Sequence, residues 1–80
     1  MHIKILGPGC KNCRHLEAHT RDALAALGLD ATVEEVTDYA TIAGYGVLKT
    51  PGLVVDEQVV VSGRVPGTDE IAALLTAQTS

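Results

Sequence analysis

Two cysteines separated by two residues, at the junction of a strand-like segment and a helical one, constrain this chain more than any other feature. They are Cys10 and Cys13, the only cysteines among its 80 residues. The apolar run that ends at Leu6 predicts a strand, Gly-Pro-Gly at residues 7–9 ends it, and an amphipathic helical pattern follows directly. A cysteine at the start of a helix faces unpaired backbone N–H groups and the positive end of the helix dipole, and both favour its thiolate form.

This arrangement favours redox chemistry, because the thiolate is the reactive form of a thiol and the second cysteine can close a small disulfide ring. Such a short ring restricts the unfolded chain little, so stability is a poor reason for the pair. The alternatives are two unremarkable thiols or half of a metal site. His15 and His19 are four positions apart on the same helix and are the further ligands to consider. The helical wheel puts them on its polar side, away from Cys13, where they are interpreted as surface residues.

Length and composition indicate one small domain, residues 1–80, and exclude several kinds of protein. The formal net charge of −4 argues against nucleic-acid binding, and no apolar stretch approaches the length of a membrane span. The first residues lack the basic and long apolar parts of a signal peptide. We therefore expect a cytoplasmic protein with no membrane or nucleic-acid partner, in a compartment where a cysteine pair is more often catalytic or metal-binding than structural.

Hydrophobic periodicity predicts an α/β chain with the order strand, helix, strand, helix, strand, strand, helix. The predicted strands cover residues 2–6, 31–36, 53–55 and 59–62, and the predicted helices cover 11–27, 39–43 and the segment after the cap Thr68. The first crossover is long enough for a right-handed parallel unit, whereas the turn at 56–58 implies an antiparallel hairpin. The result is a four-stranded mixed sheet with helices on both faces.

Burial is predicted from the same patterns. Both hairpin strands are nearly continuous in apolar residues, which suggests burial on both faces of the sheet. Tyr39 and Tyr45 are interpreted as packing residues. The core face of the first helix is predicted to contain Cys13, Leu16, Thr20, Ala23, Leu24 and Leu27.

This order of elements resembles the thioredoxin fold in its minimal form. The motifs that carry the resemblance are Gly9-Cys10-Lys11-Asn12-Cys13, Thr50-Pro51-Gly52, the hairpin end Ser62-Gly63-Arg64-Val65 and the closing helix. The resemblance covers residues 3–75, and it is closest to the small thioredoxin-like and glutaredoxin-like redox-active disulfide proteins of archaea and bacteria. The cysteine pair together with Thr-Pro before a hairpin is much more specific than the cysteine pair alone.

The resemblance implies a thiol–disulfide oxidoreductase, and more specifically a protein disulfide reductase. Cys10 is then the attacking thiol and Cys13 the resolving one. Pro51 is expected to follow a cis bond and to face the disulfide. The backbone of Thr50 is expected to hold the substrate chain in extended form, and Gly63 to leave room for that chain.

Lys11 and Asn12, between the cysteines, are expected to support the Cys10 thiolate, Lys11 by its charge and Asn12 by hydrogen bonds at most. For Lys11, as for Arg14, the alternative is a plain solvated charge. The expected partners are protein disulfides and a separate disulfide reductase that regenerates the dithiol; no cofactor and no metal is required. The alternative function is a soft-metal or metalloid binding module that uses the two thiolates as ligands.

Overall fold

The computed structural model describes residues 1–79, and its helices and strands follow the predicted order. Where a boundary differs from its predicted position, it differs by a single residue. None of the helices in this part of the chain is long and apolar enough to cross a membrane. The elements are β1 (His2–Leu6), α1 (Lys11–Leu27), β2 (Thr32–Val36), α2 (Tyr39–Gly44), β3 (Gly52–Val55), β4 (Gln58–Ser62) and α3 (Thr68–Thr79).

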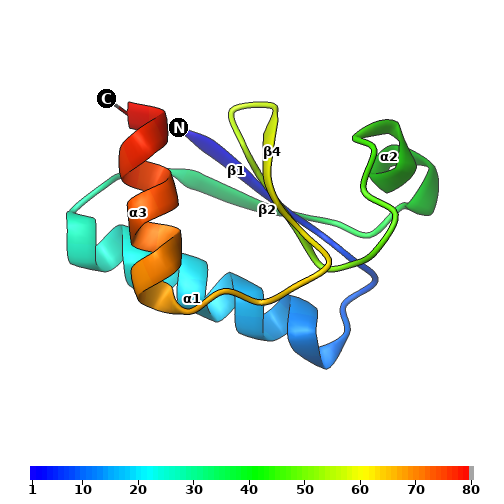
Figure 1. The fold of residues 1–80 in the computed structure, drawn as a ribbon, viewed down its shortest axis with the longest axis horizontal. Helices are drawn as coiled ribbons and strands as arrows, with labels where there is room; N and C mark the ends of the chain where they lie inside the picture. Colours follow the sequence, from blue (N-terminus) through cyan, green and yellow to red (C-terminus); the bar gives the residue numbers. More distant parts are fainter. Residues whose placement is uncertain (80) are drawn as a thin grey trace.

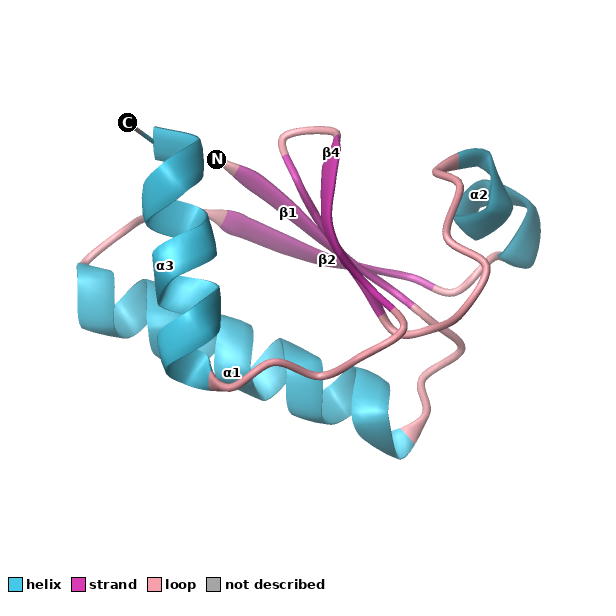
Figure 2. Ribbon diagram, in the orientation of Figure 1, coloured by secondary structure: helices cyan, strands magenta, loops and turns pink. Residues whose placement is uncertain are grey.

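The strands form one mixed sheet in the order β2-β1-β3-β4 (Figure 2). β1 pairs in parallel with β2 and antiparallel with β3, and β3 pairs antiparallel with β4. The crossover through α1 and the β3–β4 hairpin therefore have the predicted directions. In this register Leu6, at the end of β1, lies opposite Gly52, at the start of β3, and Gly52 lies opposite Ser62, at the end of β4. The segments that follow β1, precede β3 and follow β4 consequently meet at one end of the sheet.

Helices cover both faces of the sheet, as predicted, and divide the core into two parts. Because side chains alternate along a strand, Ile3 and Ile5 of β1 face one way and Leu6 the other. The larger part of the core lies under α1 and α3, which pack together along one face (Figure 1). The smaller part lies on the opposite face under α2, where Ile42 and Val47 pack against strand residues.

α1 buries one stripe, made by Cys13, Leu16, Thr20, Ala23 and Leu24. The Thr20 hydroxyl is satisfied within the helix, since it donates to the Leu16 carbonyl at 2.8 Å. The helix ends at Gly28, whose left-handed φ of 67° suits a residue without a Cβ. The prediction that Leu27 belongs to the core face is wrong: its side chain is 39% exposed. Periodicity gives the direction of a side chain but not the point at which neighbouring elements stop covering it.

The hairpin turn is formed by Asp56 and Glu57 alone, and both have positive φ, at 47° and 68°. Two left-handed residues give the turn a twist that matches the strands it joins. Asp56 is held there by β1, because its carboxylate accepts from the His2 N–H and its own N–H donates to the His2 carbonyl, each at 2.8 Å. Gln58, which was predicted to lie in the turn, is the first residue of β4.

The prediction of burial on both faces is confirmed for β3 and wrong for β4. Every residue of β3 is buried, because this strand lies between β1 and β4. β4 is the edge strand, and its Val59 is 40% exposed. An apolar strand sequence does not reveal whether the strand lies at the centre or the edge of a sheet.

A polar cluster on the α2 face joins β1 to the hairpin turn and to the end of α2. The Lys4 ammonium donates to the Tyr45 hydroxyl at 2.6 Å and to the Glu57 carboxylate at 2.9 Å. The Tyr45 hydroxyl donates to the other Glu57 oxygen at 3.0 Å. The hydrogen bond to Tyr45, followed by that to Glu57, raises the pKa of Lys4. Tyr45 is thus a packing residue, as predicted, whereas the same prediction is wrong for Tyr39, which is 68% exposed.

The two tyrosines provide a matched test of this cluster. Tyr45→Phe removes a hydroxyl that accepts from Lys4 and donates to Glu57, so we expect it to lower the free energy of unfolding by about 1 kcal/mol. Tyr39→Phe, at an exposed position, should change it by less than about 0.5 kcal/mol. Urea unfolding followed by circular dichroism measures both variants. Equal effects of the two substitutions would show that the cluster contributes nothing to stability.

Candidate active site

The candidate site lies where three segments distant in sequence meet at one end of the sheet. A Cβ placed on Gly7 would lie 2.2 Å from the Cys13 sulfur and 3.7 Å from the Cβ of Thr50, so the cysteine segment and the Thr50 segment are neighbours. The Gly63 N–H donates to the Pro51 carbonyl at 2.9 Å, which joins the third segment to the second. The structure therefore brings together the cysteines, Thr50-Pro51 and Gly63, as the resemblance implied.

Gly7 provides the space in which the Cys13 sulfur lies. At 2.2 Å, a Cβ on Gly7 would overlap that sulfur, whereas at Gly9 a Cβ would meet nothing within 4 Å. Cys13 is 5% exposed, in the first turn of α1. The sequence analysis missed this requirement, because Gly-Pro-Gly after a strand is sufficiently explained as a chain break. The one available clue is the position of Gly7 at the strand end that precedes a helix with a buried cysteine.

Cys10 occupies the N-cap position of α1, where serine, threonine, asparagine and aspartate are preferred. Its backbone is extended, with φ −70° and ψ 170°, and its sulfur accepts from the Cys13 N–H at 3.3 Å. The side chain is exposed, unlike that of Cys13. A sulfur atom thus takes the place that an oxygen has in an ordinary capped helix.

The two thiols differ in acidity. The pKa of Cys10 is below its ordinary value because its sulfur accepts hydrogen bonds, from the Cys13 thiol first and then from the Cys13 N–H. The pKa of Cys13 is raised, first by burial and then by the hydrogen bond it gives to Cys10. Cys10 is therefore the more acidic thiol and ionises before Cys13 as the pH rises. Both directions agree with the predicted roles of attacking and resolving thiol.

Lys11 and Asn12 differ in how they meet their predicted supporting roles. The backbone N–H of Asn12 is among the donors that lower the pKa of Cys10. Lys11 is exposed, and the main causes of that lowering are hydrogen bonds and not its charge. The first turn of α1 contains no acidic residue. Arg14, the next basic residue, donates to the Gly9 carbonyl at 3.5 Å.

The Thr50-Pro51 bond is cis, as expected from the resemblance. Pro51 is buried, and Thr50 is half-buried beside Gly7. Within the described chain, the backbone N–H and carbonyl of Thr50 take part in no hydrogen bond, either in the sheet or in the loops. A pair of free backbone groups next to a strand can accept an extended peptide as an added strand.

Gly63 has two structural reasons to be glycine. Its φ of 76° is left-handed, and a Cβ there would lie 3.0 Å from the Cβ of Lys49. The residue therefore allows the Lys49 segment to approach the end of β4 closely.

Of the two histidines considered as metal ligands, His15 is exposed, as interpreted from the helical wheel, whereas His19 is half-buried. The Nδ1 of His19 lies 3.0 Å from the Pro66 carbonyl, which joins α1 to the segment before α3. Among residues 1–79, no three His, Cys, Asp or Glu side chains are grouped so as to hold a metal ion. The metal-binding alternative therefore gains no support.

Comparison with known proteins agrees with this geometry. The thioredoxin domain family matches residues 1–76 of the chain. The thioredoxin of Methanothermobacter thermautotrophicus is 40% identical over 76 residues, which cover 95% of this chain and 99% of that protein. The thioredoxin of Methanocaldococcus jannaschii is 38% identical over 69 residues, covering 86% of this chain and 79% of that protein.

The difference in acidity predicts the order in which the cysteines are alkylated. Only the thiolate reacts, so each rate rises with pH through the pKa of its thiol, at lower pH for Cys10 and at higher pH for Cys13. We expect iodoacetamide to label Cys10 first when the reduced protein is treated at mildly acidic pH. Mass spectrometry of the digested protein, over a series of pH values, gives both profiles.

Variants of Cys13 test whether its thiol is the cause of the lowered pKa of Cys10. Cys13→Ala removes the thiol donor but keeps the backbone N–H, so the Cys10 profile should move to higher pH. Cys13→Ser keeps a donor and should move it less. Identical pH profiles for the two cysteines, or an earlier rise for Cys13, would contradict the assignment.

Proposed function

The chain belongs to the thioredoxin domain family and is a thiol–disulfide oxidoreductase, and from this premise we propose that it reduces the disulfides of other proteins with Cys10 and Cys13. The observation that carries the proposal is the unequal setting of the two sulfurs. Cys10 is exposed and its pKa is lowered, while Cys13 is buried and its pKa is raised. A reductase needs one accessible thiolate to attack and one protected thiol to resolve.

In the proposed reaction the Cys10 thiolate attacks one sulfur of the substrate disulfide. The substrate S–S bond breaks, a mixed disulfide forms, and the released substrate sulfur leaves as a thiolate that takes up a proton. Cys13 then loses its proton and attacks the Cys10 sulfur, which releases the second substrate thiolate and closes the Cys10–Cys13 bond. The second substrate thiolate also takes up a proton, so the substrate gains two electrons and two protons. Counted from the dithiol with both thiols protonated, the protein loses the same, because Cys10 gives up its proton before the attack and Cys13 during resolution.

The Thr50 segment is proposed to hold the substrate backbone during this exchange. Its free N–H and carbonyl support the role, since they can pair with an extended chain beside the cysteine segment. Pro51 has no N–H, so it brings no competing donor to the sulfurs. Gly63 keeps the end of β4 free of a side chain beside this segment. Lys11 and Asn12 are proposed to assist the Cys10 thiolate, Asn12 through its backbone N–H.

The proposal treats residues 1–80 as one domain that works without a bound cofactor. A separate disulfide reductase returns the oxidised pair to the dithiol, and the compartment is the reducing cytoplasm. The family match over residues 1–76 supports the domain assignment.

Trapping the mixed disulfide tests the proposed roles. Cys13→Ser leaves the attacking thiol without its resolving partner, so a peptide disulfide should stay bound through Cys10. Cys10→Ser should form little adduct, because the remaining thiol is buried and its pKa is raised. Mass spectrometry under non-reducing conditions measures both, and dithiothreitol should release the adduct. Equal adduct formation by the two variants would reverse or remove the assignment of Cys10.

The midpoint potential tests the direction of the reaction. The Cys10 thiolate is favoured by hydrogen bonds at one helix N-terminus, and no histidine lies between the cysteines. Because stabilising the thiolate stabilises the reduced pair, we expect that stabilisation to be moderate. The potential should lie nearer that of thioredoxin, about −270 mV, than that of the oxidant DsbA, about −120 mV. Equilibration with glutathione buffers of known ratio measures it. A midpoint above about −180 mV would favour an oxidase or isomerase instead of a reductase.

A further inference from the structure

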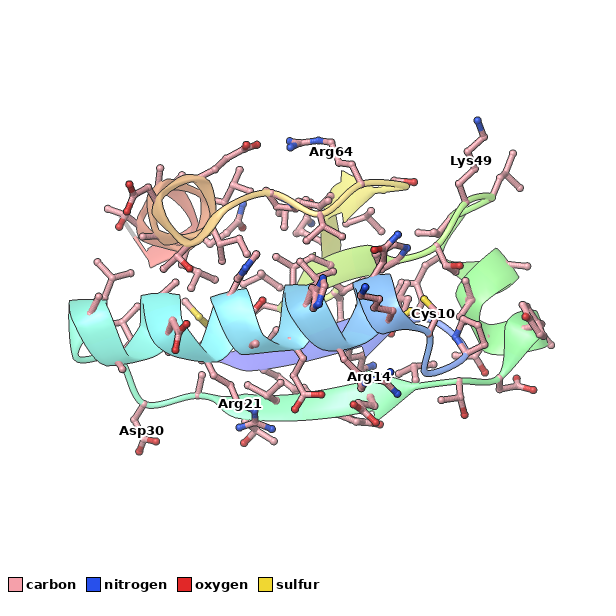
Figure 3. All side chains as sticks on the ribbon, turned by 90° about the horizontal axis from the view of Figure 1, so that it is seen from below. Cys10, Arg14, Arg21, Asp30, Lys49 and Arg64 are labelled. Carbon is pink, nitrogen blue, oxygen red and sulfur yellow. The ribbon has the colours of Figure 1, made fainter. Side chains whose placement is uncertain are left out.

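The charges of this protein are distributed unevenly around the candidate site. Three segments form the site, residues 7–14, 46–52 and 62–67, and they contain four of the six Lys and Arg residues of the chain but none of its ten Asp and Glu residues. Figure 3 shows Cys10 and Lys49 toward one end of the molecule, Arg14 and Arg64 nearer its middle and Asp30 toward the other end. We call the four cations, Lys11, Arg14, Lys49 and Arg64, the basic rim.

The members of the basic rim are not equally available to a partner. Arg64 pairs with Glu70 of α3, and Arg14 donates to the Gly9 carbonyl. Lys11 and Lys49 form no ion pair with any residue from 1 to 79. Lys49 is exposed, and its segment lies close to Gly63, where an added Cβ would lie 3.0 Å from the Cβ of Lys49. Two cations are thus unpaired at the rim of the site.

Local stability does not explain the position of Lys11, whereas Arg14 has a local partner in the Gly9 carbonyl. Cations in the first turn of a helix oppose the helix dipole, and acidic residues suit it. α3 follows that rule, with Asp69 and Glu70 in its first turn, whereas α1 has no acid in its first turn. The charge of Lys11 is therefore better explained by what approaches the site than by the helix itself.

Leu48 adds an apolar contact beside these charges. Its side chain is 92% exposed, and it directly precedes Lys49 and lies two residues before Thr50. A chain paired with the backbone of Thr50 would pass close to both side chains.

We propose that the preferred substrate is a protein disulfide flanked by acidic residues, whose carboxylates pair with Lys49 and Lys11 while Cys10 attacks. This proposal rests on the proposed reductase function and adds the class of substrate. The net charge of −4 does not oppose it at close range, since the Debye length at physiological salt is about 8 Å and the molecule is 32 Å long. Acids at the far end, such as Asp30 (Figure 3), are screened. Asp38 is nearer, because β2 ends beside Gly7, but its carboxylate already accepts from the Thr41 N–H and hydroxyl. Lys11 and Lys49 are therefore the unpaired charges that an approaching segment meets.

Three peptides of one sequence, each with a single internal disulfide, test the proposal. The residues flanking the cysteines are Asp in the first peptide, Ser in the second and Lys in the third. Reduced protein, freed of reductant, transfers two electrons and two protons to the peptide in one turnover and becomes oxidised, so no further reductant is needed. The second-order rate constant is measured for each peptide and divided by its rate constant with dithiothreitol, which corrects for the intrinsic reactivity of each disulfide.

The expected order is acidic, neutral, basic, with a difference of roughly tenfold between the first and last in low salt, as a few exposed charge pairs would give. The difference should shrink as salt is added.

Lys49→Gln should reduce the preference for the acidic peptide over the basic one by roughly two- to fivefold. Gln58→Glu changes the net charge equally, but at the end of β4 remote from Gly63, and should leave the preference unchanged. Unfolding midpoints of the two variants verify that both are folded.

The outcomes separate this proposal from the one on which it rests. If no peptide is reduced, the reductase function fails, and the proposed substrate class with it. If all three are reduced at equal corrected rates, or if Lys49→Gln and Gln58→Glu act alike, the reductase function stands and the acidic preference is wrong. Glutathione disulfide is tested as a fourth substrate. A corrected rate constant above that of the acidic peptide would show that the basic rim binds a small anion, and would overturn the proposal.

Discussion

The N-terminus of α1 is capped by a sulfur atom, and the chemistry of the site depends on this one interaction. The Cys13 N–H donates to the Cys10 sulfur at 3.3 Å, where most helices use an oxygen. With no acidic residue in the first turn, the negative charge that suits this end of the helix comes only from the Cys10 thiolate. The same hydrogen bond that completes the helix therefore favours the reactive form of the thiol.

The site also depends on the surroundings of the Cys13 sulfur, which raise the pKa of its thiol where those of Cys10 lower it. Cys13 is three residues along the same helix turn, yet its side chain is nearly inaccessible, because it lies against Gly7 at the end of β1. Burial raises the pKa of Cys13, and its thiol donates a hydrogen bond that lowers the pKa of Cys10. The two cysteines thus acquire different acidities from their places on one helix and from a single missing Cβ. A side chain on Gly7 would remove the space on which the difference depends.

The sheet supplies the remaining parts of the site through its register. Leu6, Gly52 and Ser62 lie across from one another on three adjacent strands, so the segments beyond them must meet. Two of these segments are fixed together by the bond from the Gly63 N–H to the Pro51 carbonyl. The polar cluster of Lys4, Tyr45 and Glu57 ties β1 to the hairpin turn and to the end of α2. The site therefore lies at one end of the sheet, where the register of β1, β3 and β4 fixes the positions of the segments that form it.

The sequence alone determined the order of the elements, the directions of the β1–β2 and β3–β4 pairs and the position of both cysteines at the start of α1. These features are local: a change of hydrophobic period, a glycine able to adopt a positive φ and the length of a connection can all be recognised within a few residues of sequence. The resemblance to the thioredoxin fold added the cis bond before Pro51, which no local pattern indicates.

Only the tertiary structure decided which surfaces are covered and which segments meet. Leu27, Tyr39 and Val59 are apolar or aromatic, and yet each is exposed, since no other element lies over it. Gly7 could be identified as the place for the Cys13 sulfur only when β1 and α1 were set in space. The same is true of Lys11 and Lys49, which are 38 positions apart in the printed sequence and become members of one rim through the sheet register. Exposure, close approach and charge clustering depend on contacts between distant residues, and a pattern of neighbouring residues contains no information about them.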